Sequence, residues 1–194
     1  MLLAKSSFSN DRGFSLVETL VATTIMTVAL ASLAQLFLIS TKANQSARIT
    51  TNASVLAQQK MEQLRGLMWG FDIIGLPVSD TTSDLTVVPE QPQGGPGLTP
   101  SPDGSLQSNV DGYVDFLDGR GQSLGSGSVA PPNTVYVRRW SVEPLPTNPN
   151  NTLILQVMVT RWRARGVADT ETTGGGRRLP DEARILSVKT RKAS

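Results

Sequence analysis

A run of 52 consecutive residues, Phe14 to Arg65, contains neither glycine nor proline. These are the two residues that most often end a helix, so the run predicts one continuous α-helix. Its first part, residues 14–39, is rich in Leu, Val, Ala, Ile and Thr, and Glu18 is its only charged residue. As a helix this part is about 39 Å long, enough to cross the roughly 30 Å apolar core of a bilayer. We therefore predict a transmembrane segment at residues 14–39.

The second part of the helix, residues 40–68, is predicted to be amphipathic. Apolar residues recur at helical spacing, and they are Ala53, Ala57, Met61, Leu64 and Met68, with Leu56 beside them. Polar residues take the other side, and they are Gln58, Gln59, Glu62, Gln63 and Arg65. This pattern indicates that the far end of the helix packs on another layer of the same protein.

Residues 69–132 are predicted to be an irregular connecting region. Eight prolines lie between Gly66 and Pro132, together with many Gly, Ser, Asp and Thr residues. Two short strands are predicted within it, at residues 85–88 and 113–117. The stretch 90–104 has too few apolar residues for a core, so we expect it to form a surface loop.

Residues 133–194 are predicted to form an antiparallel sheet. Alternating apolar residues indicate strands at 134–142 and 152–162, and a last strand is predicted at 184–190. In the middle strand Leu153, Leu155, Val157 and Val159 share one face, which matches the apolar side of the helix. The predicted fold class is therefore α+β, with a long N-terminal helix packed on a C-terminal antiparallel sheet.

Composition removes several classes of function. The chain has no His and no Cys, so it can form no disulfide, zinc finger, Cys nucleophile or Ser-His triad. No phosphate-binding loop, dinucleotide fingerprint or nucleophile elbow is present either. We therefore predict that the protein is not an enzyme and holds no cofactor.

The start of the chain carries its most specific motif. A short polar stretch, residues 1–13, ends at Gly13, and an apolar run follows whose fifth residue is Glu18. This arrangement resembles the processing site of type IV prepilins and of the related pseudopilins of type II secretion. The resemblance implies that residues 1–13 are a leader, that prepilin peptidase cuts between Gly13 and Phe14, and that the new Phe14 amine is methylated.

The same resemblance implies an assembly role for Glu18. A carboxylate at the end of a membrane segment is costly and usually marks a function or a partner. Four residues separate Phe14 from Glu18, about one helical turn. In the family, the carboxylate compensates the N-terminal amine of a neighbouring subunit; the spacing here permits such a contact, and it would repeat along a fibre.

A second stretch narrows the resemblance. AlaGlnGlnLysMetGluGlnLeuArg, residues 57–65, is similar to the outer helix of PilV-like minor pilins and of GspI-type minor pseudopilins. The resemblance implies a single-pass bacterial inner-membrane protein with a cytoplasmic leader, which joins other pilins in a pilus or pseudopilus. Many major pilins have a Pro in the membrane segment and a C-terminal disulfide loop. This chain has neither, which favours a minor subunit.

Three other interpretations compete with these. Residues 1–39 are also compatible with a signal anchor, or with a signal peptide cut near residues 29–31. The pairs Asp103-Gly104, Asp111-Gly112 and Asp118-Gly119, with Asp115, offer oxygens for Ca²⁺, although Asp-Gly is first a turn sequence. Several arginines lie late in the chain, and they are Arg138, Arg139, Arg161, Arg163, Arg165, Arg177 and Arg178. Such a cluster would suit binding to DNA, although a solvated edge of the sheet or an acidic partner protein is favoured. Trp140 and Trp162 are expected in the core or on a sheet face.

Overall fold

The computed structural model describes residues 15–162 and 181–191, which form parts of two compact units, Met1–Gln45 and Ser46–Ser194. Helix α1, Leu16–Gly66, is 51 residues long and contributes to both units. It begins within two residues of the predicted start and ends at the first glycine after the uninterrupted run. The prediction of one continuous helix is confirmed.

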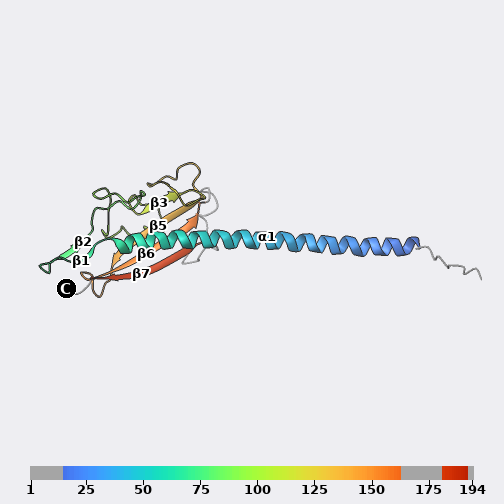
Figure 1. Cartoon of the computed structure of the whole chain (residues 1–194), viewed down its shortest axis with the longest axis horizontal. Helices are drawn as coiled ribbons and strands as arrows, with labels where there is room; N and C mark the ends of the chain where they lie inside the picture. Colours follow the sequence, from blue (N-terminus) through green and yellow to red (C-terminus); the bar gives the residue numbers. More distant parts are fainter. Residues whose placement is uncertain (1–14, 163–180, 192–194) are drawn as a thin grey trace, which may run out of the picture. The chain divides into compact units, whose positions relative to one another are not determined.

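The second unit contains a five-stranded sheet with the strand order β4-β3-β5-β6-β7, in which every neighbouring pair is antiparallel (Figure 1). Its strands are β3 Val114–Leu117, β4 Ser123–Gly125, β5 Tyr136–Pro144, β6 Thr152–Arg161 and β7 Ala183–Thr190. The four strands predicted at 113–117, 134–142, 152–162 and 184–190 are therefore present. Two strands of the sheet, β3 and β4, come from the connecting region.

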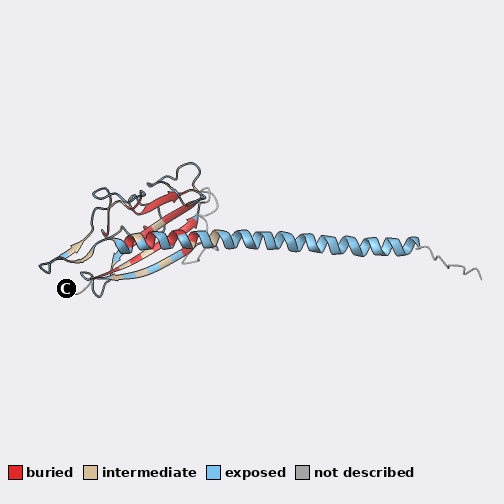
Figure 2. Ribbon diagram, viewed as in Figure 1, coloured by how far each residue is buried: buried red, intermediate tan, exposed pale blue. Residues whose placement is uncertain are grey.

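The core lies between the last turns of α1 and one face of the sheet (Figure 2). The helix contributes Ala53, Leu56, Ala57, Met61 and Leu64, all buried, and β6 contributes Leu153, Leu155, Val157 and Val159. The predicted α+β fold class, a pilin-like helix on an antiparallel sheet, is thus confirmed. Met68 is an exception, since it is 63% exposed. The helix has ended before this residue, so helical spacing no longer turns its side chain inward.

The connecting region differs from its prediction in two places. A small hairpin is present, β1 Trp69–Phe71 with β2 Pro77–Ser79. The strand predicted at residues 85–88 is wrong, because this segment is irregular and only an isolated bridge, Asp84 with Gln91, lies beside it. Leu85 is buried there whereas Val88 is 60% exposed. The apolar run reflects one buried anchor rather than a paired strand.

The loop at residues 90–104 contributes to the core, contrary to the expectation of a purely surface loop. Leu98 is 2% exposed and belongs to the main core cluster. Its amide donates to the carbonyl of Asp80 at 2.6 Å, and the amide of Ser101 donates to the carbonyl of Val142 at 2.9 Å. One leucine and a few backbone hydrogen bonds are enough to fasten a stretch that is otherwise rich in Pro and Gly.

Candidate functional site

The described part of the N-terminal segment opens with a capped helix. The amide of Glu18 donates to Ser15 Oγ at 3.2 Å, and the amide of Thr19 donates to the Ser15 carbonyl at the same distance. Ser15 is therefore the residue that caps α1, and Glu18 stands in its first turn. An acidic side chain in this place interacts favourably with the helix dipole. Gly13 and Phe14, the predicted cleavage and methylation residues, lie outside the described residues.

The apolar half of α1 is exposed along its whole length in the first unit (Figure 2). Large apolar side chains point outward on all sides of it, among them Leu20, Ile25, Leu33 and Phe37, each more than 60% exposed. Among the described residues, α1 is the one helix long and apolar enough to cross a membrane. A helix that is apolar all round needs an apolar surrounding, which a bilayer or packed neighbouring helices provide.

Six hydroxyl groups in this half of α1 bond to the helix itself. Each donates to a backbone carbonyl three or four residues earlier, and the donors are Thr19, Thr23, Thr24, Thr27, Ser32 and Thr41. The Thr27 bond to the Thr23 carbonyl, for example, measures 2.7 Å. These hydroxyls therefore demand no outside partner, which makes the segment compatible with lipid despite its polar residues.

A buried group of charges joins α1 to the sheet in the second unit. Asp115 on β3 and Arg138 on β5 are paired residues of the sheet, and Arg138 Nη2 lies 2.6 Å from Asp115 Oδ2. Lys60 on α1 reaches the same oxygen, with its Nζ at 3.2 Å. None of the three side chains is more than 1% exposed. We call Lys60, Asp115 and Arg138 the helix clamp.

The cations of the helix clamp also bind the backbone. Arg138 Nη1 donates to the Leu56 carbonyl on α1 at 3.0 Å, and Lys60 Nζ donates to the carbonyl of Leu85. Lys60 Nζ further lies 4.5 Å from the ring centre of Trp140. These contacts hold α1, the sheet and the irregular segment at Leu85 together at one place.

Burial lowers the pKa of the Lys60 ammonium group. Removal from water lowers its pKa from 10.5 to about 8, the Asp115 carboxylate opposes this shift, and the nearby Arg138 cation adds to it. The group holds two cations against one anion. We therefore regard it as a structural device that specifies how the helix seats on the sheet, not as catalytic machinery.

The second fastening lies at the C-terminal end of α1. Lys189 on β7 donates from Nζ to the Arg65 carbonyl at 2.6 Å, to the Leu64 carbonyl at 3.4 Å and to the carbonyl of Leu67. The last carbonyls of a helix lack intrahelical partners and carry partial negative charge, so a cation suits them. Lys189 thus caps α1.

Three arginines of the predicted basic cluster lie among the described residues. Arg138 is buried in the helix clamp, so its assignment to a solvated or DNA-facing cluster is wrong. Arg139 bonds to Asn109 Oδ1 at 2.8 and 3.0 Å, and Arg161 is exposed at the end of β6. Arg163, Arg165, Arg177 and Arg178 lie outside the described residues. Trp140 is fully buried and Trp162 packs against Phe116 on the opposite sheet face, as expected.

The Asp-Gly pairs form turns. Gly104 and Gly112 have φ values of 77° and 80°, which favour glycine, and Asp118 Oδ1 accepts the amides of Arg120 and Gln122. Asp115 belongs to the helix clamp and is not available to an ion in solution. Within residues 15–162 and 181–191, no group of three or more His, Cys, Asp and Glu side chains could hold a metal ion.

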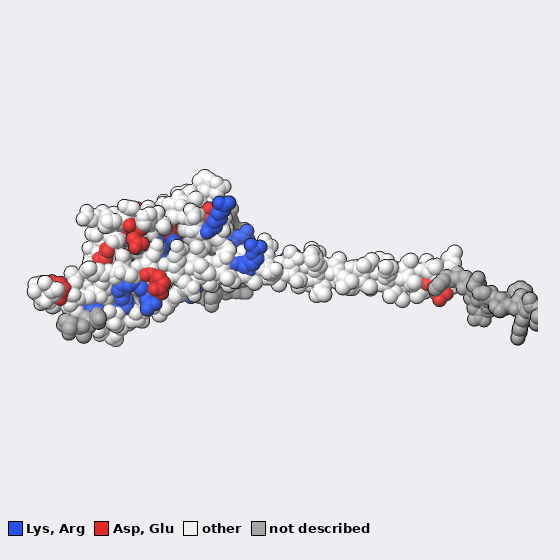
Figure 3. Space-filling view, in the orientation of Figure 1, with Lys and Arg blue, Asp and Glu red and all other residues white. Residues whose placement is uncertain are grey.

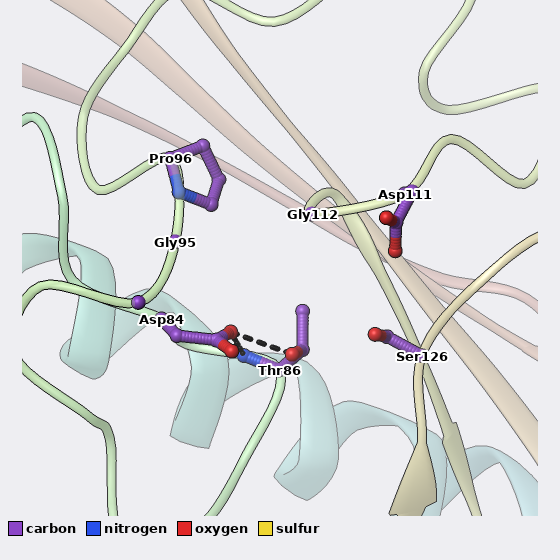
Figure 4. A pocket seen from close by; sticks show the side chains of 8 residues that line it. Asp84, Thr86, Gly95, Pro96, Asp111, Gly112 and Ser126 are labelled. Carbon is purple, nitrogen blue, oxygen red and sulfur yellow. Dashed lines mark hydrogen bonds between the residues drawn. The ribbon is translucent and has the colours of Figure 1, made fainter.

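A polar pocket of about 350 Å³ lies among these loops (Figure 4). Asp84 and Thr86 line one side, joined through Asp84 Oδ1 to the Thr86 amide at 2.8 Å and to its hydroxyl at 2.5 Å. Asp111 and Ser126 line the other side. The Asp84 carboxylate is thus used to shape the turn that follows it.

Comparison with known proteins identifies the N-terminal segment. Residues 8–34 match the family model of the prokaryotic N-terminal methylation motif. No curated protein and no solved structure matches the chain. The match includes Gly13, Phe14 and Glu18 and covers the start of α1. Together with the exposed apolar helix, it supports a membrane-anchored, single-pass protein of the type IV pilin-like and pseudopilin class.

Members of this motif family are structural pilin subunits rather than enzymes, and the motif implies processing by prepilin peptidase and assembly with other pilins. Sequence reasoning found the motif, the membrane half of α1 and most of the strands. It missed Lys60 and misplaced Arg138, although both stand at positions whose neighbours on the same face are apolar.

Proposed function

We propose that this chain is a minor type IV pilin-like subunit that joins or primes a pilus-like fibre. Prepilin peptidase cuts it between Gly13 and Phe14 and methylates the Phe14 amine, and Glu18 compensates the amine of a neighbouring subunit. The observation that supports this most is the methylation-motif match at residues 8–34, placed on a helix whose apolar half is exposed on all sides. Such a helix needs neighbours, and in a fibre they are the helices of other subunits.

Glu18 suits the proposed role because of its place in α1. It is the only charged residue between Leu16 and Ile39, and it stands one turn after the cap formed by Ser15. An isolated carboxylate in apolar surroundings gains most from a cation, and the N-terminal amine of a processed neighbour is one.

The minor pseudopilin of a type II secretion system is the second candidate. The likeness of residues 57–65 to GspI-type chains favours it, and the motif is common to both classes. A DNA-binding competence pilin is less supported, since Arg138 is buried and Arg139 is engaged with Asn109.

Mass spectrometry of the mature N-terminus tests the processing step. We expect a first peptide that begins with N-methylated Phe14, and no such peptide from Gly13→Ala. A matched control, Ser9→Ala in the same leader, should be processed normally. A mature chain that begins near Ser32 would instead show a cleaved signal peptide and overturn the proposal.

The assembly step has its own test. Glu18→Ala should be processed yet absent from sheared fibres, or should abolish fibre initiation or secretion in cells that depend on this subunit. Glu62→Ala, an exposed acidic residue later in the same helix, is the matched control and should assemble. Normal fibre incorporation of Glu18→Ala would contradict the role given to this carboxylate.

A further inference from the structure

The turn of the β1–β2 hairpin exposes a set of large apolar side chains. Ile73 is 102% exposed, Ile74 74% and Leu76 57%. Aliphatic side chains are seldom presented to water this completely and side by side, and such contiguous exposure marks an interaction site. We call Ile73, Ile74 and Leu76 the hairpin tip. In Figure 3 the hairpin end of the molecule is uncharged surface with one acidic spot.

The hairpin tip is held in a fixed shape. Asp72 Oδ1 accepts the amides of Ile74 at 3.0 Å and Leu76 at 2.8 Å, and the Asp72 amide donates to the Leu76 carbonyl at 2.9 Å. Gly75 supplies a φ of 80°, which lets its amide reach the Asp72 carbonyl at 3.1 Å. The apolar side chains are therefore preorganised, which lowers the entropic cost of docking them.

The base of the hairpin is fastened to the sheet. Arg191, directly after β7, donates from Nη1 to the carbonyls of Gly70 at 2.9 Å and Val78 at 2.7 Å. Its guanidinium stacks 3.6 Å from the ring centre of Trp69. The sheet thus supports the hairpin tip, which is a built projection and not a loose loop.

A complementary surface lies on the same chain, on the face of β6 and β7 that points away from α1. Leu186 and Val188 are 61% and 55% exposed there, and Val188 is paired in register with the half-buried Ile154. Arg184 borders these residues and bonds to Gln156 at 2.5 Å. We call Ile154, Leu186 and Val188 the outer patch, with Arg184 at its rim.

Charge and position indicate which kind of partner the hairpin tip binds. Between Gly66 and Gly119 there are eight acidic residues and no basic one, and the Arg191 cation at the base of the hairpin is bonded to backbone carbonyls there. The hairpin tip itself therefore carries none of the cations that favour an anionic bilayer surface. Within the second unit, β1 and β2 follow the C-terminal end of α1 and lie at the opposite end of the sheet from the side on which the helix enters (Figure 1). An apolar protein surface is the better match, and the outer patch is such a surface, with Arg184 at its rim on β7 and the exposed Glu143 on β5 beside Ile154.

We propose that the hairpin tip of one copy docks on the outer patch of a second copy, with Asp72 near Arg184. The contact uses two different surfaces, so it is head-to-tail and can repeat without closing. Each interface is small, and anchoring of both copies by α1 in one membrane supplies the effective concentration that it needs. This goes beyond the proposed function, which requires only contacts between N-terminal helices.

Cysteine cross-linking tests the contact because the chain has no Cys of its own. Ile73→Cys and Leu186→Cys are made in two full-length chains with different tags, co-expressed in one membrane and treated with a short bis-maleimide. We expect a mixed dimer of the two tagged chains at several times the yield of Ile73→Cys with Ser128→Cys, an exposed control outside the outer patch. Equal yields from the two pairs would overturn the proposal.

A charge exchange provides the second arm. In the same cross-linking pair, Ile74→Lys should lower the yield several-fold by placing a cation against the apolar outer patch beside Arg184. Val188→Glu in the other chain offers that cation a partner, leaves Arg184 to Asp72, and should restore the yield. Ile74 is exposed, so thermal melts of the variants should stay unchanged. An unchanged yield with Ile74→Lys would also overturn the contact. The Ile73→Cys and Leu186→Cys cross-linking is then repeated in chains that also carry Gly13→Ala. The yield should not change, because the docking surfaces lie in the second unit and do not depend on cleavage of the leader.

Discussion

Asp115 and Arg138 stand directly opposite each other on β3 and β5, and both turn toward α1, where Lys60 meets the same carboxylate. The strand register alone fixes this pairing. Because both residues lie on the helix-facing side of the sheet, the carboxylate is carried into the core together with one cation, and the helix delivers the second. The Asp115 carboxylate on β3 thus binds cations from both α1 and β5. Lys60 and Asp115 are 55 residues apart in the sequence.

Asp115→Asn should be severely destabilising. It would leave Lys60 and Arg138 buried without their counter-charge, and breaking a buried ion pair costs about 3–5 kcal/mol. Urea unfolding of the full chain in detergent, followed by tryptophan fluorescence, measures the loss. Glu62→Gln is the control, because its pair with Arg65 is 3.1 Å long but more than half exposed, and it should change the unfolding free energy by about 0.5 kcal/mol or less. Similar losses from both variants would contradict the helix clamp.

Stability should rise between about pH 8 and pH 10. Lys60 has a pKa of about 8 in the folded chain and near 10.5 when unfolded, so in this window the unfolded chain binds more protons and folding is favoured by raising the pH. The rise should be about 1–2 kcal/mol, measured from urea unfolding at each pH. Burial also lowers the pKa of Lys189, which adds to the slope in the same direction.

Lys60→Met separates these contributions. It removes the titrating group while Asp115 keeps Arg138 as a partner, so the chain should stay folded with a loss of about 1 kcal/mol or less. The rise with pH should become clearly smaller. A pH slope equal to that of the unchanged chain would show that another group titrates in this window.

Gly95→Ala should destabilise the loop that carries Leu98. A Cβ at this position would lie 2.8 Å from the Cβ of Asp84 and closer still to its Cα, and backbone cannot give way as a flexible side chain can. We expect a loss of about 2 kcal/mol or more in the unfolding free energy. Gly66→Ala is the matched control, since a Cβ there meets nothing within 4 Å, and its unfolding free energy should be unchanged or slightly higher.

Ser15→Ala should loosen the start of α1. The cap bond to the Glu18 amide would be lost, at about 1 kcal/mol, which corresponds to roughly five-fold faster hydrogen exchange of that amide. Hydrogen exchange of the full chain in micelles measures this. Ser32→Ala, whose hydroxyl bonds within the helix, should leave the Glu18 amide unaffected.

Periodicity explains why much of the fold was predictable. The run without Gly or Pro predicts α1, and alternation at Leu153, Leu155, Val157 and Val159 predicts both β6 and its buried face. The segment at residues 85–88 shows the limit of this reasoning, because a short apolar run does not state whether a partner strand is available. Leu98 shows another, since one leucine among Pro and Gly gives no period at all.

The helix clamp was not predicted because its partners are distant in sequence. The pattern contained a hint, since Lys60 falls between Ala57 and Leu64 on the apolar stripe, and Arg138 alternates with Tyr136 and Trp140 on one sheet face. A charge at such a position must have a buried counter-charge. Which acid provides it depends on the register of β3 with β5, and no local pattern determines that.

The way α1 is fastened has a mechanical consequence. A tensile force along this helix enters the second unit near Ser46 and passes to the sheet through the side-chain contacts that the last turns of α1 make. Arg138 at the Leu56 carbonyl, Lys60 at Asp115 and Lys189 at the Arg65 carbonyl load in parallel, over about three turns of the helix. A force along α1 is thus shared by several bonds that must break together before the helix separates from the sheet. This suits a subunit that is pulled through the N-terminal half of α1.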